Sequence, residues 1–229
     1  MSLNKPIWKL RDWIDESKLN WIRLSANPNA IHLLEQNQNK IDWIRLSGNP
    51  NAIKLLEENP DKIYWFLLSK NPNAIELLKK NQDKINWCFL SGNYNAIDLL
   101  EKNLNKIDWV ELSGNPNGIH LLERNQNKID WKYLSKNPNA IKLLEENRNK
   151  INWEYLSANS NAIKFLKENQ NNIDWFELSK NPSIFELDYE AMKRNNLEME
   201  EELIKEVMKP SRVFKYPDYD YIEELFGDD

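Results

Sequence analysis

The sequence predicts an all-α protein, a right-handed α-solenoid of eight 22-residue helix-turn-helix repeats with helical caps at both ends. The first observation is a period, because the stretch "WIRLSGNPNAIKLLEENPDKIY" (43–64) returns with small changes every 22 residues. A fixed period of 20–50 residues is typical of solenoids and related arrays. Capping residues at fixed places and apolar residues at helical spacing are the other two observations. Positions below are counted from the tryptophan that opens each unit.

The units share a fixed set of apolar and polar residues, called the frame below. Leu at +3, Ser at +4 and Asn at +6 occur in all eight units, and Pro at +7 occurs in six. The tryptophans stand three residues before the invariant Leu, and a buried indole removes a large area from water, so we expect them to form the structural core. They are Trp21, Trp43, Trp65, Trp87, Trp109, Trp131, Trp153 and Trp175.

Each unit divides into two short helices. Asp42 precedes Trp43 and predicts an N-cap for a first helix that ends near Ser47. Asn49 and Pro50 then predict the N-cap and first position of a second helix, because a missing N–H costs nothing at a helix start. The repeated Asn residues are therefore expected to serve in caps and in ladders between stacked units. A single unit buries too little to fold alone, so stacking is required.

The chain is expected to have three parts. Residues 1–20 form an N-terminal cap, residues 21–182 form the repeat solenoid, and residues 183–229 form a C-terminal helical cap with an acidic tail. In the last part "LEMEEELIKEVMKPSRV" predicts an amphipathic helix stopped by Pro210, which we expect to cover the last apolar face of the array.

Composition excludes several classes of function. Residues 183–229 hold 14 acidic and 6 basic residues, which leaves 22 acidic and 25 basic residues in the rest of the chain. A nearly neutral array lacks the basic footprint of a dedicated nucleic-acid binder. No stretch approaches 18 apolar residues and the start has no signal-peptide core, so we expect a soluble protein without a membrane partner.

Residues that could carry chemistry are few. His32 and His120 are the two histidines, both at +11 and four units apart, so they cannot share a metal within one chain. Cys88, the single cysteine, stands where other units carry apolar residues and is expected to pack. We therefore expect no enzyme activity, no catalytic residue, no metal and no cofactor.

Variation on the fixed frame points to binding. Positions +1 and +2 of the first helix change most in character from unit to unit, and solenoids build long binding faces from one such element per repeat. The alternative is that some of these side chains, especially Phe66 and Phe176 at +1, pack between units. Tyr, Phe and Arg at +2 are types enriched at interface hot spots. The candidate partner-binding face comprises Arg23, Arg45, Leu67, Phe89, Glu111, Tyr133, Tyr155 and Glu177.

The motif "WxxLSxNPNAIxLLExNxxKID" resembles the short Trp/Asn-rich helical repeats of proteins from giant DNA viruses, the mimivirus-like group. The segment "MKPSRVFKY" is similar to the one that closes such proteins. The departures are Tyr94 and Ser160 in place of Pro, Gly118 in place of Ala, and Asn172 in place of Lys. The resemblance implies a helical-repeat protein with no catalytic residue to carry over.

These observations predict a monomeric, non-enzymatic scaffold or adaptor that binds a viral or host protein along one solenoid face. The resemblance places it in the host cytoplasm, with the virion or virus factory as the other locations. One alternative is a structural component of a virion or filament that self-assembles end to end. The other is a nucleic-acid reader, favoured by Arg23, Arg45 and Lys54 but interrupted by acidic residues such as Glu76 and Asp98.

Overall fold

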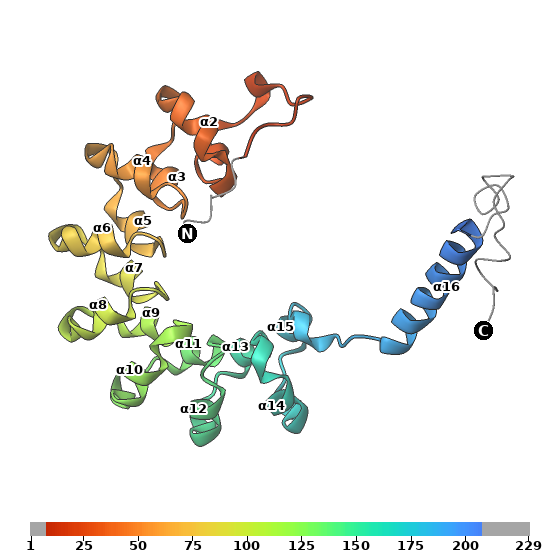
Figure 1. The fold of residues 1–229 in the computed structure, drawn as a ribbon. Coiled ribbons are helices and arrows are strands. Elements are labelled where there is room, and N and C mark those ends of the chain that lie inside the picture. The colour runs from red at the N-terminus through yellow and green to blue at the C-terminus, as the bar shows by residue number, and fades with distance from the viewer. Residues whose placement is uncertain (1–7, 208–229) are drawn as a thin grey trace, which may run out of the picture. The chain divides into compact units, whose positions relative to one another are not determined.

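The computed structural model describes residues 8–207, in which every regular element is a helix (Figure 1). The chain separates into two compact units, Met1–Ile184 and Phe185–Asp229. The first unit holds the repeat array, and the described part of the second unit consists of a short lead-in and one long helix. The α-solenoid prediction is confirmed, because helix pairs recur at the period of the sequence and contact their neighbours.

A first helix opens each of the eight repeats at its tryptophan. Seven of these helices are capped by the side chain of the Asp or Asn before the tryptophan, and α5, preceded by Tyr64, has no side-chain cap. The eight first helices are α1 (Trp21–Ser25), α3 (Trp43–Ser47), α5 (Trp65–Lys70), α7 (Trp87–Ser91), α9 (Trp109–Ser113), α11 (Trp131–Lys136), α13 (Trp153–Ser157) and α15 (Trp175–Leu178).

A second helix follows in the first seven repeats. It begins at the Ile at +10, three residues later than Pro50 predicts, because the Asn at +6 caps a tight turn: Asn51 N–H donates to Asn49 Oδ1 at 3.1 Å. The start predicted at Pro50 is therefore wrong. The second helices are α2 (Ile31–Gln36), α4 (Ile53–Glu57), α6 (Ile75–Lys80), α8 (Ile97–Glu101), α10 (Ile119–Glu123), α12 (Ile141–Glu146) and α14 (Ile163–Glu168).

Short 3-10 helices complete the repeats. Each of the first seven units ends in a 3-10 helix that was not predicted from the sequence. Other 3-10 helices form the turn before a second helix or lie at the ends of the array. They are η1 (Glu16–Lys18), η2 (Pro28–Ala30), η3 (Gln38–Lys40), η4 (Pro60–Lys62), η5 (Gln82–Lys84), η6 (Leu104–Lys106), η7 (Pro116–Gly118), η8 (Gln126–Lys128), η9 (Arg148–Lys150), η10 (Ser160–Ala162), η11 (Gln170–Asn172) and η12 (Pro182–Ile184).

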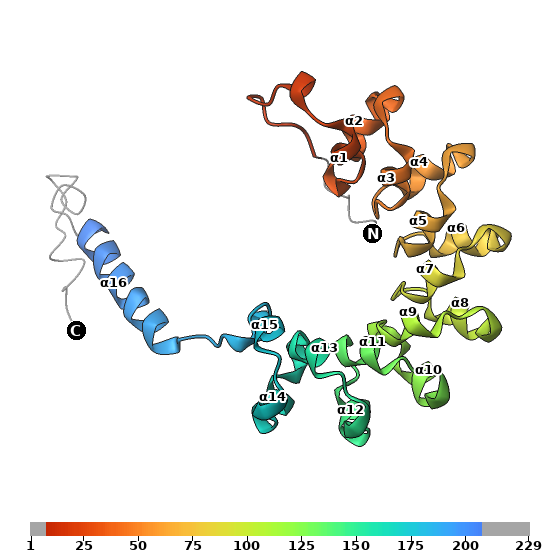
Figure 2. The same cartoon turned by 180° about the vertical axis from the view of Figure 1, so that it is seen from behind.

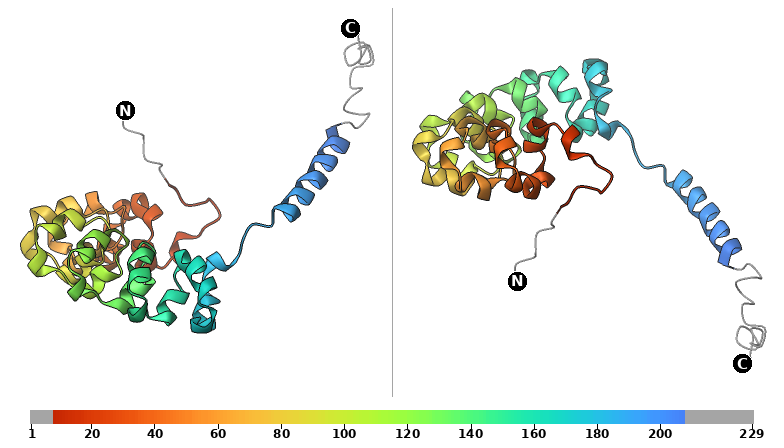
Figure 3. Two further views of the ribbon diagram at one scale, coloured as in Figure 1. Left: turned by 90° about the horizontal axis from the view of Figure 1, so that it is seen from below. Right: turned by 90° about the horizontal axis from the view of Figure 1, so that it is seen from above.

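Within the first compact unit the repeats form an arc. The first helices lie along its inner side and the second helices along its outer side (Figures 1 and 2). Consecutive first helices contact one another more than consecutive second helices do, which brings the inner row closer together. Seen edge on, the units at the two ends of the array are offset, so the arc is part of an open superhelix (Figure 3).

Leucines fill the core of the array. The Leu at +3, +12 and +13 are buried in the inner repeats, as Leu46, Leu55 and Leu56 are in the second unit. The tryptophans are instead half-buried and pack against this leucine core from its edge, and Trp175 is 64% exposed. The prediction that the indoles form the core is therefore corrected: they cover its rim, because the smaller Leu side chains fit the narrow space between layers.

A hydrogen-bond ladder ties each repeat to the one before it. Asn49 Nδ2 donates to the carbonyls of Ser25 and Asn27, both at 3.0 Å, and its side chain is 1% exposed. Asn51 Nδ2 donates to Pro28 C=O at 2.9 Å, and Asp42 N–H donates to Ser25 Oγ at 3.0 Å. The predicted role of the Asn residues in caps and ladders is confirmed. Every buried side-chain nitrogen or oxygen in the described part of the chain has a partner.

The two ends of the array are built differently. Residues 8–20 contain η1 as their regular structure, and the N-terminal cap of residues 1–20 stays a prediction. The eighth repeat has α15 followed by η12 in place of a second α-helix.

In the second compact unit α16 (Tyr189–Val207) is a single helix that begins eight residues before the segment predicted from the sequence. It carries exposed apolar side chains, including Met192, Leu203 and Ile204. The predicted stop at Pro210 and the acidic aromatic tail lie outside the described residues. The docking of this helix on the array stays a prediction.

Candidate protein-binding face

The inner row of first helices presents the candidate face. Position +2 lies in the middle of each first helix, one residue before the buried Leu at +3, so its side chain turns away from the core. The side chains at Arg23, Arg45, Phe89 and Tyr133 are exposed, and those at Leu67, Glu111, Tyr155 and Glu177 are half-buried. All eight predicted residues are therefore accessible on consecutive helices of one side of the arc.

Two neighbouring cavities lie along this row. The larger, of about 540 Å³, is lined by four of the predicted residues: Phe89, Glu111, Tyr133 and Tyr155. The next, of about 200 Å³, is lined by Tyr155 and Glu177 among others. The groove thus runs from α5 to α15 and gathers the five C-terminal residues of the predicted set. Arg23, Arg45 and Leu67 do not line either cavity.

Aromatic contacts connect neighbouring repeats on this face. The rings of Phe66 and Phe89 lie 5.9 Å apart, and those of Tyr133 and Tyr155 lie 6.3 Å apart. Lys132 Nζ lies 4.9 Å from the centre of the Tyr155 ring. Glu111 belongs to the repeat between these two pairs, so the larger cavity offers aromatic rings, phenolic hydroxyl groups and a carboxylate. Such a mixture suits recognition of a protein segment.

The residues at +5 were missed by the sequence analysis and complete the groove. Lys70, Gly92, Gly114 and Lys136 line the larger cavity together with the +2 residues. A Cβ at Gly92 would lie 3.2 Å from Glu111 Oε2, so the absence of a side chain gives room to the +2 residue of the next repeat. The signal was available, because +5 varies among Ala, Gly and Lys between the invariant Ser at +4 and Asn at +6, and it lies three residues after +2 on the same helix face.

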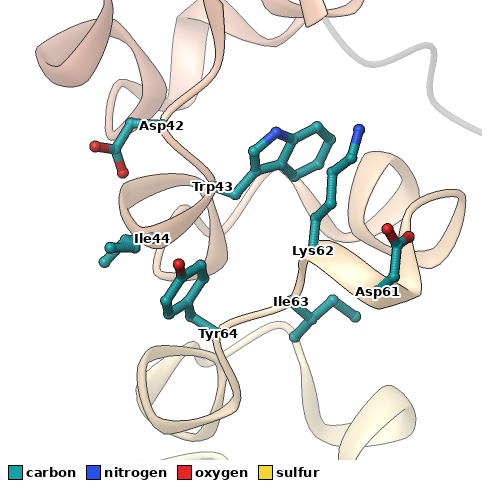
Figure 4. A pocket seen from close by; sticks show the side chains of 7 residues that line it. All are labelled: Asp42, Trp43, Ile44, Asp61, Lys62, Ile63 and Tyr64. Atoms are coloured by element: carbon teal, nitrogen blue, oxygen red, sulfur yellow. The ribbon is translucent and has the colours of Figure 1, made fainter. Parts of the chain in front are cut away.

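A lysine covers the indole in six of the repeats. Lys62 Nζ lies 4.6 Å from the centre of the Trp43 ring, beside a shallow pocket of about 470 Å³ that Ile44 and Tyr64 also line (Figure 4). The same pairing joins Lys40 to Trp21, Lys84 to Trp65, Lys106 to Trp87, Lys128 to Trp109 and Lys150 to Trp131. The lysine occupies the ring face on which a sugar or base would stack, so the tryptophans serve the scaffold.

In the seventh repeat an aromatic ring, and not a lysine, packs against the indole. Asn172 stands where the other units have the stacking lysine, and Phe165 stands where they have Leu at +12. The Phe165 ring stacks on Trp153 with centroids 5.8 Å apart and planes 9° from parallel. The two departures therefore belong together: the lysine that would cover Trp153 is absent, and the ring of Phe165 covers this indole instead.

The titratable side chains do not form a catalytic or metal-binding cluster. His32 lies in α2 beside Gln36 and Glu35, and His120 lies in α10 with its Nε2 2.7 Å from Glu101 Oε1. Among the described residues no group of three or more His, Cys, Asp or Glu side chains is arranged to hold a metal ion.

Cys88 is exposed at +1 of α7, so the prediction that it packs is wrong. Partial desolvation raises the pKa of its thiol, and the hydrogen bond and negative charge of Asp108 raise this pKa further. A raised pKa leaves less thiolate at neutral pH, which is the opposite of what a nucleophilic cysteine requires.

None of the described helices is both long and apolar enough to cross a membrane.

Comparisons with known proteins give one match. No curated protein and no solved structure is significantly similar to this chain. The model of one family, described as periplasmic copper-binding protein (NosD), matches residues 14–183, which span the repeat array. The description assigns copper to that family, but the isolated histidines and the cysteine of raised pKa do not fit a copper site in the described residues. With 170 of its 229 residues matched, the chain belongs to the NosD family.

Proposed function

We propose that the protein is a non-enzymatic scaffold or adaptor that binds another protein in the groove of its first-helix row. The observation that carries the proposal is the continuous groove in which Phe89, Glu111, Tyr133 and Tyr155, one from each of four successive repeats, line a single cavity of about 540 Å³. These side chains vary on a fixed frame and are accessible on one side of an arc. Solenoid proteins bind their partners on surfaces of this kind.

The chemistry of the groove indicates what kind of segment would fit. Phe89 offers an apolar contact, Tyr133 and Tyr155 offer rings with hydroxyl groups, and Lys70 and Lys136 place positive charges on the same cavity as Glu111. A partner segment with apolar side chains and at least one carboxylate would meet both requirements. Aromatic side chains in such a groove are expected to carry most of the binding energy.

The origin and location proposed for the partner are based on the sequence resemblance. The resemblance of the 22-residue motif to repeats of giant DNA viruses supports a viral or host protein as the partner, encountered in the host cytoplasm, the virus factory or the virion. The proposal does not use copper, because the donor set does not fit it, and it does not use nucleic acid, because Glu111 and Glu177 stand in the same row as Arg23 and Arg45.

The test compares protein capture by the wild type and by a variant that lacks the aromatic side chains of the groove. The full-length protein is used as bait in extract of infected and uninfected host cells, beside a variant with Phe89, Tyr133 and Tyr155 changed to Ser. A matched control changes Asp98, Lys142 and Lys164 to Ser, which are exposed at +11 on the second helices of the same three repeats. Circular dichroism and the thermal midpoint verify that all three proteins are folded.

The expected result is a protein captured by the wild type and the control and lost by the groove variant. For that captured protein, titration is expected to show binding at least about a hundredfold weaker for the groove variant, since each aromatic anchor contributes about 1–2 kcal/mol. Equal capture by all three baits would contradict the proposal, and so would loss in the control alone.

A further inference from the structure

The interface between repeats occurs seven times within the chain, and among the described residues of Met1–Ile184 one half of it has no partner at each end of the array. At the first six junctions the later repeat donates four hydrogen bonds and the earlier repeat accepts them, as Asn93 shows by donating to Ser69 C=O at 3.1 Å and Asn71 C=O at 3.0 Å. The seventh junction has three of the four, because Ser183 stands where the other repeats have the Asn at +8. The first repeat has no earlier repeat to receive its donors. The last repeat has no later repeat to donate hydrogen bonds to its acceptors.

The donor half stands at the first repeat. Asn27 Oδ1 accepts the Asn29 N–H at 3.0 Å, as in every other unit. Among the described residues, however, no acceptor lies within hydrogen-bond distance of Asn27 Nδ2, Asn29 Nδ2 or the Asn20 N–H. Both Asn27 and Asn29 are exposed, whereas Asn49 is buried.

The acceptor half stands at the last repeat. Asn181 Nδ2 donates backward to Ser157 C=O at 3.1 Å and Asn159 C=O at 3.0 Å, so this repeat keeps the bonds of the Asn at +6 to the array. In the described range no side-chain amide donates to the carbonyls of Ser179, Asn181 or Pro182. Ser179 Oγ donates to Trp175 C=O at 2.6 Å but accepts no backbone N–H, unlike Ser157 Oγ, which accepts that of Asp174.

The apolar parts of both faces are also incompletely covered. Leu24 and Leu33 of the first repeat are half-buried, whereas the corresponding Leu46 and Leu55 are 0% and 1% exposed. At the other end Leu178 is half-buried, and Trp175 is exposed where its counterparts are half-buried. The two faces therefore resemble a separated repeat junction in both their polar and their apolar parts.

Residues 8–10 cover the donor half only loosely. Trp8 and Leu10 line a cavity of about 430 Å³ together with Leu24, Leu33 and Asn27. Trp8 remains 52% exposed there. A cavity of this size between the segment and the repeat shows that the two surfaces are not closely packed, so the segment can be displaced by a better-fitting surface.

We propose that the C-terminal face of one copy docks on the N-terminal face of a second copy, so that the repeat stacking continues from chain to chain. The occupant is a second copy because the donors of Asn27 and Asn29 match the acceptors of Ser179, Asn181 and Pro182, in the arrangement that the chain itself contains in full six times. The contact is heterologous and the array is an open superhelix, so the assembly is a filament rather than a closed pair. Association displaces residues 8–10 and is therefore concentration-dependent.

Two variants block one end each without affecting the inner junctions. Asn27→Asp keeps the oxygen that accepts the Asn29 N–H but replaces the donor with a carboxylate oxygen facing carbonyl oxygens. Ser179→Lys places a long charged side chain on the acceptor face, at a position that is exposed in the structure. Asn39→Asp, at an exposed position in η3, adds the same charge as Asn27→Asp and serves as the matched control.

Sedimentation of the full chain over a concentration series is the test. The wild type and the control are expected to gain mass as concentration rises, and each blocked variant is expected to stay monomeric at concentrations at least about tenfold higher. A mixture of the two blocked variants is expected to form dimers and nothing larger, because each retains the end that the other lacks. Trp8→Ser with Leu10→Ser is expected to strengthen association of the otherwise wild-type chain.

A wild type that stays monomeric up to about 1 mM would overturn the proposal, and would mean that another segment of the chain or another protein covers these faces. Association that survives in either blocked variant alone would also overturn it, because the contact would then lie elsewhere. The groove variant changes none of these residues, so failure of the assembly proposal leaves the partner-binding proposal standing.

Discussion

The asparagine at +6 combines two roles that no other side chain of its size can fill. In the fourth repeat Asn93 Oδ1 accepts the Asn95 N–H at 3.1 Å, while its Nδ2 donates to two carbonyls of the preceding repeat. Asp could accept but not donate, and Ser has a single hydrogen to give. The residue joins the local turn to the neighbouring layer, which explains why all eight units carry it.

Asn93 and Asn95 offer a matched pair for measuring the ladder. Asn93→Ala removes the buried amide that donates to Ser69 C=O and Asn71 C=O, of which Asn71 C=O keeps the Ala74 N–H at 3.1 Å. Because position 93 is 2% exposed, we expect unfolding free energy to fall by about 3 kcal/mol. Asn95→Ala removes one exposed bond, to Pro72 C=O at 3.0 Å, and should cost about 1 kcal/mol or less. Urea unfolding followed by circular dichroism gives both values. Equal losses in the two variants would show that burial does not control the strength of the ladder.

At the scale of the element, the first helices are too short to be stable by themselves. Most of them have five or six residues, which is below the length at which isolated helices form in water. Their stability comes from the cap at one end, the ladder at the other and the Leu at +3 beneath. Asp130, for example, accepts the Tyr133 N–H at 2.9 Å and fixes the start of α11.

The uncapped α5 provides a prediction about these helix starts. Tyr64→Asp supplies the carboxylate that the other helices have and should add about 1 kcal/mol to unfolding free energy, measured relative to Tyr64→Ala. The comparison with Ala is needed because either change removes the edge-on contact between the Tyr64 and Phe66 rings, whose centroids are 6.5 Å apart. Chemical denaturation of the two variants is the measurement. An Asp variant no more stable than the Ala variant would mean that the neighbouring ladder already fixes this helix start.

At the scale of the whole molecule, stability is a sum over repeats and junctions. Each repeat contacts chiefly the repeats next to it, and the two bonds of the Asn at +6 recur at all seven junctions. Such an array behaves as a one-dimensional chain of coupled units. A repeat can therefore be removed without altering the contacts of those that remain, provided that the period is kept.

Deletion of residues 87–108 tests this. The join places Asn86 before Trp109, which restores a capped first helix, and Asn115 then reaches the carbonyls that Asn93 normally binds. We expect a folded helical protein whose urea m-value is lower by about one eighth, in proportion to the surface lost. Deletion of residues 87–97 instead breaks the period and should leave the chain largely unfolded or split into two arrays. Similar denaturation curves for the two deletions would contradict the model of coupled units.

The sequence by itself determined the repeat, the helical class and the roles of the capping residues. These depend on residues close together in the chain or exactly one period apart, and so they are visible as a pattern. Asp42, Asn49 and the invariant Leu at +3 could be assigned in this way. The candidate face at +2 was also visible, because its variation stands out against a constant frame.

Only the tertiary structure decided which face is concave, how the +5 residues complete the groove, and that the tryptophans lie at the rim of the core. Curvature accumulates from small differences in distance between the inner and outer helix rows, and those distances depend on contacts between layers. The space above Gly92 is taken by Glu111 of the next repeat, and Lys62 covers Trp43 after a third, 3-10 element that the period alone does not reveal. Packing between layers, which no local pattern encodes, set these features.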